Sequence, residues 1–378
     1  MSRTDAKSPR SFGEEAIERI CVNAYPLLVS EAYARLLASR AIDPLARAGR
    51  PATLANAEGA SLECRAAWLH VKTPEIHLQT VPCNDYHVCT LLDAELQPFA
   101  SIGTRSAGGA RQELVLLSPS STNSTSHHAQ GIRCPSDLIA VLTHHVRFGR
   151  ESTASNGSPF RIEDQNGKAL VDLEGPVETL DAVAHVEALR PEQYFSEALG
   201  VLHEMPGIAA ANVVAAGVQK SFATIASSAR ASAPSKGWAS IDHRLRDRTP
   251  EGHAASVHAG YFPAESHDIL EVVTRCDESG TALDGARTYR MRFERWNEPP
   301  SHASWFLYVA PAAPGRVNLV RAEPAMTIML GPRPTNGQGE NWIRTLPAPT
   351  PLEVRLILCW PTERARSEIW APPAIVAV

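Results

Sequence analysis

The stretch YHVCTLLDAELQPFASIGTRSAGG, residues 86–109, decides how the first half of the chain folds. Its first residues alternate between two faces with the period of a β-strand, and this places His87 and Asp93 on the same face. Pro98 cannot donate to a strand ladder, so the strand is expected to end before it. The glycines that follow predict turns. The stretch therefore predicts a buried strand that leads to a loop holding Arg105.

The length, composition and net charge of the sequence limit the class of protein. With 378 residues, 44% of them hydrophobic and 20% charged, the chain is long enough for two globular domains with real cores. The net charge of -5 argues against a nucleic-acid partner, since such proteins need cationic surface. No apolar run reaches a bilayer-spanning length, and the N-terminus lacks a signal core. Seven cysteines without a Cys-x-x-Cys pair favour a reducing compartment, so we expect a cytoplasmic protein without a membrane partner.

The order of the predicted elements is a helix, many strands, several helices and again many strands. Residues 1–11 are expected to form a disordered tail, residues 12–175 a helix followed by a β-sandwich, and residues 176–378 a helical segment followed by a second sandwich. The first helix is expected to end or kink at Pro26, and residues 177–189, 191–204 and 208–230 predict further helices. This order suits a mainly β, α+β fold with two antiparallel β-sandwich domains better than a parallel α/β sheet.

The order of motifs also resembles a family that pairs domain of unknown function 1254 with domain of unknown function 1214. The most specific runs are Phe99-Ala-Ser-Ile-Gly-Thr-Arg105 in the first half and Trp342-Ile-Arg-Thr-Leu-Pro-Ala-Pro349 in the second. Weaker pieces are Ala67-Trp-Leu69, Leu91-Leu-Asp-Ala94, Gly260-Tyr-Phe-Pro263, Leu283-Asp-Gly285 and Trp370-Ala-Pro-Pro373. The resemblance covers nearly the whole chain. It implies two jelly-roll-like β-sandwich domains with helices between them and a homo-oligomer, but no agreed reaction.

The chain departs from the family pattern at two places. Family members carry an Asn-x-Asp-Thr-x-Tyr run before the Ala-Trp-Leu strand, where this chain has Gly59-Ala-Ser-Leu-Glu-Cys64. Members also follow an Asn-Pro with an Arg-Tyr pair, where this chain has Glu323-Pro-Ala-Met-Thr-Ile328. A family site that used those polar groups is therefore lost or rebuilt here, and an altered polar lining suggests an altered substrate.

Common catalytic signatures are missing, among them a serine elbow, a phosphate-binding Gly-rich loop and a His-Glu-x-x-His pair. The candidate acid/base groups are therefore His87, Asp93 and Glu63. His87 and Asp93 share a strand face with Cys89, which fits an acid/base pair or metal ligands shared with neighbouring strands. The same pattern also fits a core strand whose polar groups are satisfied locally.

The candidate substrate-binding residues are an arginine and three aromatic residues. Arg105 can anchor an anionic or carbonyl group, or it can pair with Asp93 or tie down loop carbonyls. Trp68, Trp305 and Tyr308 can line an apolar cavity between the sheets, although such side chains more often belong to the core. The pairs His127-His128 and His144-His145 lack metal-ligand spacing with a third residue, so no metal and no other cofactor is expected.

These residues lead to two hypotheses of different classes. The first is a cofactor-independent enzyme that acts on a small, largely apolar molecule in a sandwich cavity by elimination, isomerisation, cyclisation or hydrolysis. The alternative is a non-catalytic protein, such as a small-molecule or carbohydrate-binding sandwich or a scaffold, which predicts Trp305 and Trp342 on an open face. A metal-dependent enzyme is a third possibility.

Overall fold

The computed structural model of the chain describes residues 9–37, 54–55, 60–121, 130–148, 158–171, 208–231, 237–240, 249–258, 267–294, 299–311, 325–333, 341–367 and 370–378. The helices are α1 (Pro9–Leu37), α2 (Thr104–Ala107), α5 (Ile208–Ala231), α7 (Pro250–His258) and α8 (Glu363–Arg366). The helices expected at residues 177–189 and 191–204 lie outside the described residues.

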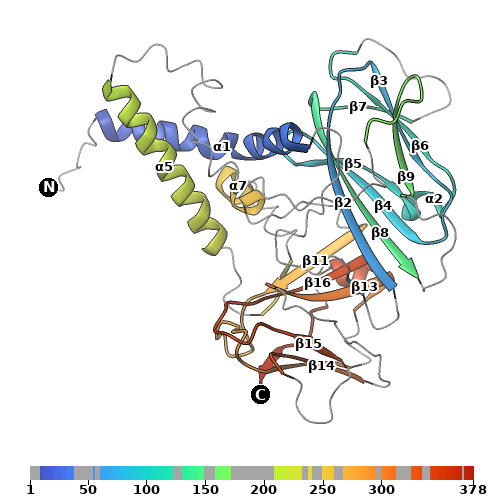
Figure 1. Cartoon of the computed structure of the whole chain (residues 1–378), viewed down its shortest axis with the longest axis vertical. Coiled ribbons are helices and arrows are strands. Elements are labelled where there is room, and N and C mark those ends of the chain that lie inside the picture. Colours follow the sequence, from blue (N-terminus) through green and yellow to red (C-terminus); the bar gives the residue numbers. More distant parts are fainter. Residues whose placement is uncertain are drawn as a thin grey trace.

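Two sheets form a sandwich in the first half of the chain (Figure 1). The strands of the larger sheet, in spatial order, are β1 (Leu54–Ala55), β2 (Ala60–His70), β8 (Leu138–Phe148), β4 (Tyr86–Leu92) and β5 (Pro98–Gly103). Those of the smaller sheet are β7 (Gln130–Arg133), β6 (Glu113–Leu117), β3 (Glu75–Thr80) and β9 (Phe160–Asp164). Alternate residues of both sheets, for example Leu78, Leu91 and Leu116, fill the space between them.

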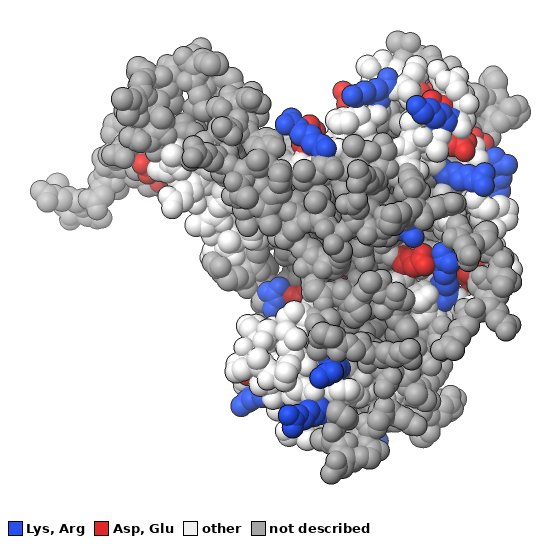
Figure 2. Space-filling model, viewed as in Figure 1, with Lys and Arg blue, Asp and Glu red and all other residues white. Residues whose placement is uncertain are grey.

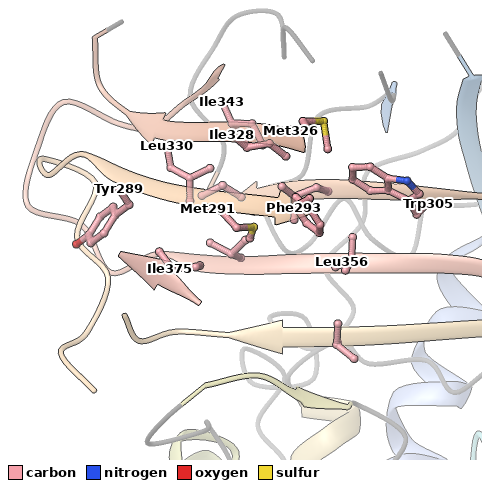
Figure 3. Close-up of a cluster of buried hydrophobic side chains, with 14 of the residues drawn as sticks. Tyr289, Met291, Phe293, Trp305, Met326, Ile328, Leu330, Ile343, Leu356 and Ile375 are labelled. Carbon is pink, nitrogen blue, oxygen red and sulfur yellow. The ribbon is translucent and has the colours of Figure 1, made fainter. Parts of the chain in front are cut away.

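The second half forms another two-sheet sandwich. One sheet contains β10 (Ala239–Ser240), β11 (Ile269–Thr274), β16 (Glu353–Pro361) and β13 (Ser301–Ala310). The other contains β15 (Trp342–Arg344), β14 (Ala325–Gly331), β12 (Tyr289–Glu294) and β17 (Ile375–Ala377). Figure 3 shows the core between them, in which Phe293 stacks on Trp305 at a ring distance of 5.4 Å. The expected mainly β, α+β fold is confirmed, but two of the four described sheets are mixed, because β6 pairs with β7 and β14 with β15 in parallel.

Helix α1 covers part of the outer face of the larger N-terminal sheet, where its Tyr25, Val29 and Tyr33 are buried, and helices α5 and α7 pack against α1. Ile225 of α5 and Val257 of α7 belong to the same apolar cluster. Of the end or kink expected at Pro26, the end does not occur, because helix α1 runs through this residue, and the helix starts at Pro9, within the segment expected to be a tail. Its buried stripe against the sheet offsets the hydrogen bond that the proline cannot donate.

The remaining part of the same outer face packs against the C-terminal sandwich. This shared cluster contains Leu62, Val88 and Val146 from the N-terminal half and Phe306 and Ile357 from the C-terminal half, all at most 1% exposed. The phenol of Tyr86 crosses the boundary and donates to the backbone carbonyl of Asp268 at 2.7 Å. The two sandwiches therefore share one apolar core layer in addition to their own interiors.

The surface carries charges of both signs. In the view of Figure 2, the Lys and Arg side chains of the described residues are scattered over both halves instead of forming one broad patch. Among the described helices, none is both long and apolar enough to cross a membrane.

Candidate functional site

Strand β4 separates two environments, because its side chains alternate between the two faces of the larger N-terminal sheet. Tyr86 and Val88 face the C-terminal sandwich, whereas Cys89 and Leu91 face the interior of the N-terminal sandwich. His87 lies on the interior side, where its ring meets the Phe160 ring edge-on at 5.4 Å. The predicted strand is thus confirmed, and it buries His87 to 1% exposure.

A row of polar residues crosses three neighbouring strands at one end of this interior face. In the strand register, Glu63 of β2 lies opposite His145 of β8, and His145 lies opposite His87 of β4. Side chains directly opposite one another in an antiparallel pair have Cβ atoms about 5 Å apart. The sheet pairing therefore brings together two predicted residues, Glu63 and His87, with a histidine that was not predicted to act.

The loop before β4 adds two further polar groups to the row. His145 Nε2 lies 3.6 Å from the carboxylate of Asp85 and 4.0 Å from the sulfur of Cys83. One donor atom from each of the three side chains lies within 4.8 Å of the others, and these atoms are of the types that hold metal ions. We call Cys83, Asp85 and His145 the Cys-Asp-His cluster.

The backbone holds this loop close to the sheet. Gly109 has a φ of +84°, and a Cβ atom there would lie 2.7 Å from the carbonyl oxygen of Cys83, so the close approach requires glycine. On the other side, Thr104 accepts the backbone N–H of His87 at 2.9 Å and donates to the Asp85 carbonyl at 3.3 Å. The positions of Cys83 and Asp85 are therefore fixed from both sides.

Hydrogen bonding also fixes the tautomer of His87. Its Nδ1 lies 2.9 Å from the Asp85 carbonyl oxygen, which can only accept, and 3.2 Å from the Thr104 hydroxyl, which donates to the same carbonyl, so we assign the proton to Nδ1. In the neutral ring, Nε2 is then the unprotonated atom that can take up a proton. Burial lowers the pKa of His87, although the carbonyl and the charge of Asp85 oppose this, so the ring is neutral near pH 7.

Burial also shifts the pKa values of His145 and Cys83. Burial, and then the charge of Arg147 and that of His87 and Arg65, lower the pKa of His145 to about 3. Burial also raises the pKa of the Cys83 thiol, despite a hydrogen bond from the Asp85 backbone. Arg147 is held by Glu63, with an Nε–Oε1 distance of 3.2 Å. The site therefore contains two neutral imidazoles, a protonated thiol and an Arg–Glu pair.

The structure does not bring Asp93 into this row. Asp93 follows β4 at its other end, in the turn to β5, where its Oδ1 accepts the backbone N–H groups of Glu95 and Gln97 at 2.9 Å each. This is an Asx-type turn, in which a carboxylate replaces a backbone acceptor. The Asp93 carboxylate therefore stabilises the turn between β4 and β5 and is not part of the polar row.

Arg105 also has a structural partner. It lies in the short helix α2, not in a loop, and its Nε donates to the carboxylate of Asp268 at 2.7 Å. Asp268 is 2% exposed and belongs to the C-terminal half. Arg105 therefore joins the two halves instead of pairing with Asp93.

The three aromatic residues predicted to bind substrate lie in three different places. Trp68 stacks on Tyr33 beneath α1 at a ring distance of 4.3 Å. Trp305 lies in the core of the C-terminal sandwich, and Tyr308 faces the boundary between the halves. All three are at most 8% exposed, and they do not converge on one cavity.

Tyr308 belongs to a buried charge network on β11, β13 and β16. Arg355 is 3% exposed and contacts the carboxylates of Glu271 and Glu353, while Arg275 binds Glu353 as well. The Tyr308 hydroxyl donates to Glu271 at 3.4 Å. These charges satisfy one another and support the sheet that faces the N-terminal half.

Comparison with known proteins supports the expected relation of the N-terminal half. A family described as "Protein of unknown function (DUF1254)" matches residues 64–155, which include the whole Cys-Asp-His cluster. No curated protein matches the sequence significantly.

One solved structure shares the fold. The VPA0106 protein from Vibrio parahaemolyticus aligns with a TM-score of 0.60 over 97% of this chain and 100% of that chain, with 12% sequence identity. An uncharacterized protein from Burkholderia cenocepacia aligns with a TM-score of 0.44 over 100% of this chain and 91% of that chain, with 13% identity. At 12% identity the likeness to the VPA0106 protein concerns the fold and not the chemistry.

Proposed function

We propose that the chain is an enzyme that acts on a small, largely apolar molecule at the polar end of the N-terminal sandwich. The observation that supports this most is the cross-strand row of Glu63, His145 and His87. His87 and His145 of this row are buried, which is costly for polar groups, and buried groups with shifted pKa values are typical of active sites.

The groups of the row have complementary roles in proton transfer. His87 Nε2 is the proposed base, because the Asp85 carbonyl keeps the proton on Nδ1. The carboxylate of Glu63, paired with Arg147, is the proposed second group for proton transfer beside His87. Phe160 provides an apolar wall beside His87. This arrangement suits elimination, isomerisation, cyclisation or hydrolysis, each of which needs a positioned base.

The carbohydrate-binding alternative receives less support. It requires aromatic side chains on an open face, and Trp305 is only 8% exposed, in the core of the C-terminal sandwich. We further propose that the C-terminal half is related to domain of unknown function 1214, and that the protein acts in the cytoplasm as a homo-oligomer. Light scattering after size-exclusion chromatography tests the last point.

The enzyme proposal is tested by turnover. The purified full-length chain is incubated with a fractionated small-molecule extract, and mass spectrometry follows which compounds are consumed. His87→Gln and Glu63→Gln are expected to lower turnover by about 100-fold or more, the usual range for a general acid or base. His70→Gln is the matched control, because His70 is exposed at the far end of β2.

Circular dichroism first establishes that the variants fold. Folded His87→Gln protein that retains full turnover would exclude the proposed base. The absence of any consumed compound in the wild-type reaction, together with a ligand that co-purifies unchanged, would favour a binding protein.

A further inference from the structure

We propose that the Cys-Asp-His cluster binds one divalent transition-metal ion, of which Zn²⁺ fits best, through Cys83 Sγ, an Asp85 carboxylate oxygen and His145 Nε2. The distances, the burial of His145 and the ligand types of the cluster support the binding site. Its use in catalysis rests on the proposed function of the same polar row.

The distances in the cluster are too long for ordinary hydrogen bonds. Nε2 of His145 lies 3.6 Å from Asp85 and 4.0 Å from Cys83, whereas a good hydrogen bond between nitrogen and oxygen spans about 2.7–3.2 Å. Around a tetrahedral zinc ion, with bonds of about 2.0–2.3 Å, neighbouring ligand atoms are roughly 3.3–3.6 Å apart. The two distances from His145 Nε2 differ from these separations by at most a few tenths of an ångström, and the sulfur of Cys83 lies within 4.8 Å of the Asp85 carboxylate.

His145 is a buried imidazole without a normal hydrogen bond among the described residues. It is 7% exposed, its Nδ1 has no partner there, and its Nε2 has only the two long contacts to Asp85 and Cys83. Buried polar groups nearly always have a partner. A metal ion at Nε2 would provide one.

The same geometry argues against a thiol nucleophile of the Cys-His-Asp type. In such a triad the carboxylate holds the ring nitrogen that faces away from the nucleophile. Here Asp85 and Cys83 both approach Nε2 of His145. The convergence of Cys83, Asp85 and His145 on one point fits three ligands of a shared metal ion better than a catalytic triad.

The charges in the cluster also suit a divalent ion. On binding, the Cys83 S–H bond breaks, the sulfur keeps the electron pair for its bond to the metal, and the proton goes to solvent. The thiolate and the carboxylate then cancel the two positive charges, and the backbone N–H of Asp85 supports the sulfur. The nearby cation Arg147 is engaged by Glu63.

The ligand types select the metal. Thiolate and imidazole suit Zn²⁺ and its first-row neighbours, whereas Mg²⁺ and Ca²⁺ prefer oxygen ligands. Three protein ligands leave one position of a tetrahedral ion for water or substrate, as in catalytic zinc sites.

Cobalt titration tests the site directly. The full-length chain is kept reduced with a phosphine, stripped with a chelator, dialysed and titrated with Co²⁺. We expect one Co²⁺ per chain, a near-ultraviolet band from sulfur-to-cobalt charge transfer, and displacement of Co²⁺ by Zn²⁺.

The variants identify the ligands. Cys83→Ser is expected to abolish the charge-transfer band, and Asp85→Asn and His145→Gln to weaken Zn²⁺ binding by more than about 100-fold, which exceeds the usual effect of an outer-shell change. Cys276→Ser and His70→Gln are matched controls, since Cys276 is another partly exposed cysteine and His70 is an exposed histidine. Both controls are expected to bind as the wild type does.

A second measurement does not depend on the folding of variants. X-ray absorption of the zinc-loaded wild type is expected to show one sulfur and three nitrogen or oxygen neighbours. A wild type without the cobalt band, a band that persists in Cys83→Ser, or a zinc shell without sulfur would overturn the proposal.

The two proposals fail separately. Metal binding that requires Cys83, in a chain that turns over no compound, supports this inference and contradicts the enzyme. Turnover that depends on His87 in a chain without the cobalt band supports the enzyme and contradicts the metal site.

Discussion

Arg105 of the N-terminal half and Asp268 of the C-terminal half form an ion pair across the boundary between the two sandwiches, with Nε 2.7 Å from Oδ1. Ser101 donates to the same carboxylate at 3.0 Å. The Asp268 side chain is 2% exposed and the Arg105 side chain 38% exposed, so the two partners are desolvated to very different extents.

This asymmetry predicts unequal costs for the two single substitutions. Arg105→Ala leaves a buried carboxylate without its cation and is expected to lower the free energy of unfolding by about 3 kcal/mol. Asp268→Asn leaves an arginine that can turn toward water, so this variant is expected to lower the free energy of unfolding by only about 1 kcal/mol. Urea unfolding followed by tryptophan fluorescence measures both, and equal costs would contradict the asymmetry.

The buried network of the C-terminal half predicts a pH dependence. Burial alone would raise the pKa of Glu353, but Arg355 and Arg275 outweigh it, and the pKa lies below the ordinary value of 4.5. A carboxyl group with a lowered pKa stabilises the fold fully above its unfolded pKa and loses this contribution as the pH falls through the folded pKa.

Glu353→Gln removes this group and its pH dependence. We therefore expect the variant to be less stable than the wild type at pH 7, with a difference that shrinks as the pH falls below about 4.5. Thermal unfolding of both proteins from pH 7 to pH 3 measures the difference. A difference that stays constant with pH would show that the carboxylate charge is not responsible.

Two neighbouring glycines form a matched pair for the loop that carries Cys83. Gly108 and Gly109 both have positive φ, +59° and +84°, so alanine at either position costs about 1 kcal/mol of backbone strain. Only at Gly109 would the new Cβ also meet the Cys83 carbonyl, at 2.7 Å, while at Gly108 nothing lies within 4 Å.

Gly109→Ala is therefore expected to destabilise the chain more than Gly108→Ala, by roughly 1–3 kcal/mol, the usual cost of an overpacked site. Denaturant unfolding compares the two variants. Equal stability would mean that the loop moves away freely.

The contact between Trp68 and Tyr33 fixes helix α1 on the sheet. The rings are parallel to within 14°, and both side chains are at most 5% exposed. Trp68→Ala is expected to cost about 3–5 kcal/mol, the usual range for loss of a large buried aromatic. Limited proteolysis of the folded variant should then cleave within residues 9–37 sooner than in the wild type, and unchanged cleavage would argue against this anchoring role.

Local patterns predicted much of the fold. The alternation at residues 86–92 and the apolar run at 113–117 correspond to β4 and β6, and the long apolar stripe at 208–230 corresponds to α5. The strand that starts at Tyr86 ends at Leu92, before Pro98 as expected, and Pro98 then begins β5, an edge strand in which a residue without a backbone N–H is tolerated. A position at the edge of a sheet depends on long-range order that no local pattern contains.

The candidate site was only partly predictable for the same reason. His87 and Glu63 were predicted from residue type, but His145 lies 62 residues from Cys83 in the sequence. Only the pairing of β4 with β8 brings them together. The nearest local signal was Cys83-Asn84-Asp85, which places a thiol and a carboxylate two residues apart immediately before a strand.

The alternation of β4 also limits how the chain can be divided. An isolated fragment of residues 60–171 would expose Leu62, Val88 and Val146 to water, although these side chains are built for burial against Phe306 and Ile357. Such a fragment would expose a contiguous apolar patch and would tend to self-associate. Expressing the N-terminal half alone for structural work would thus call for hydrophilic replacements at these three positions, all on the side of the sheet away from His87.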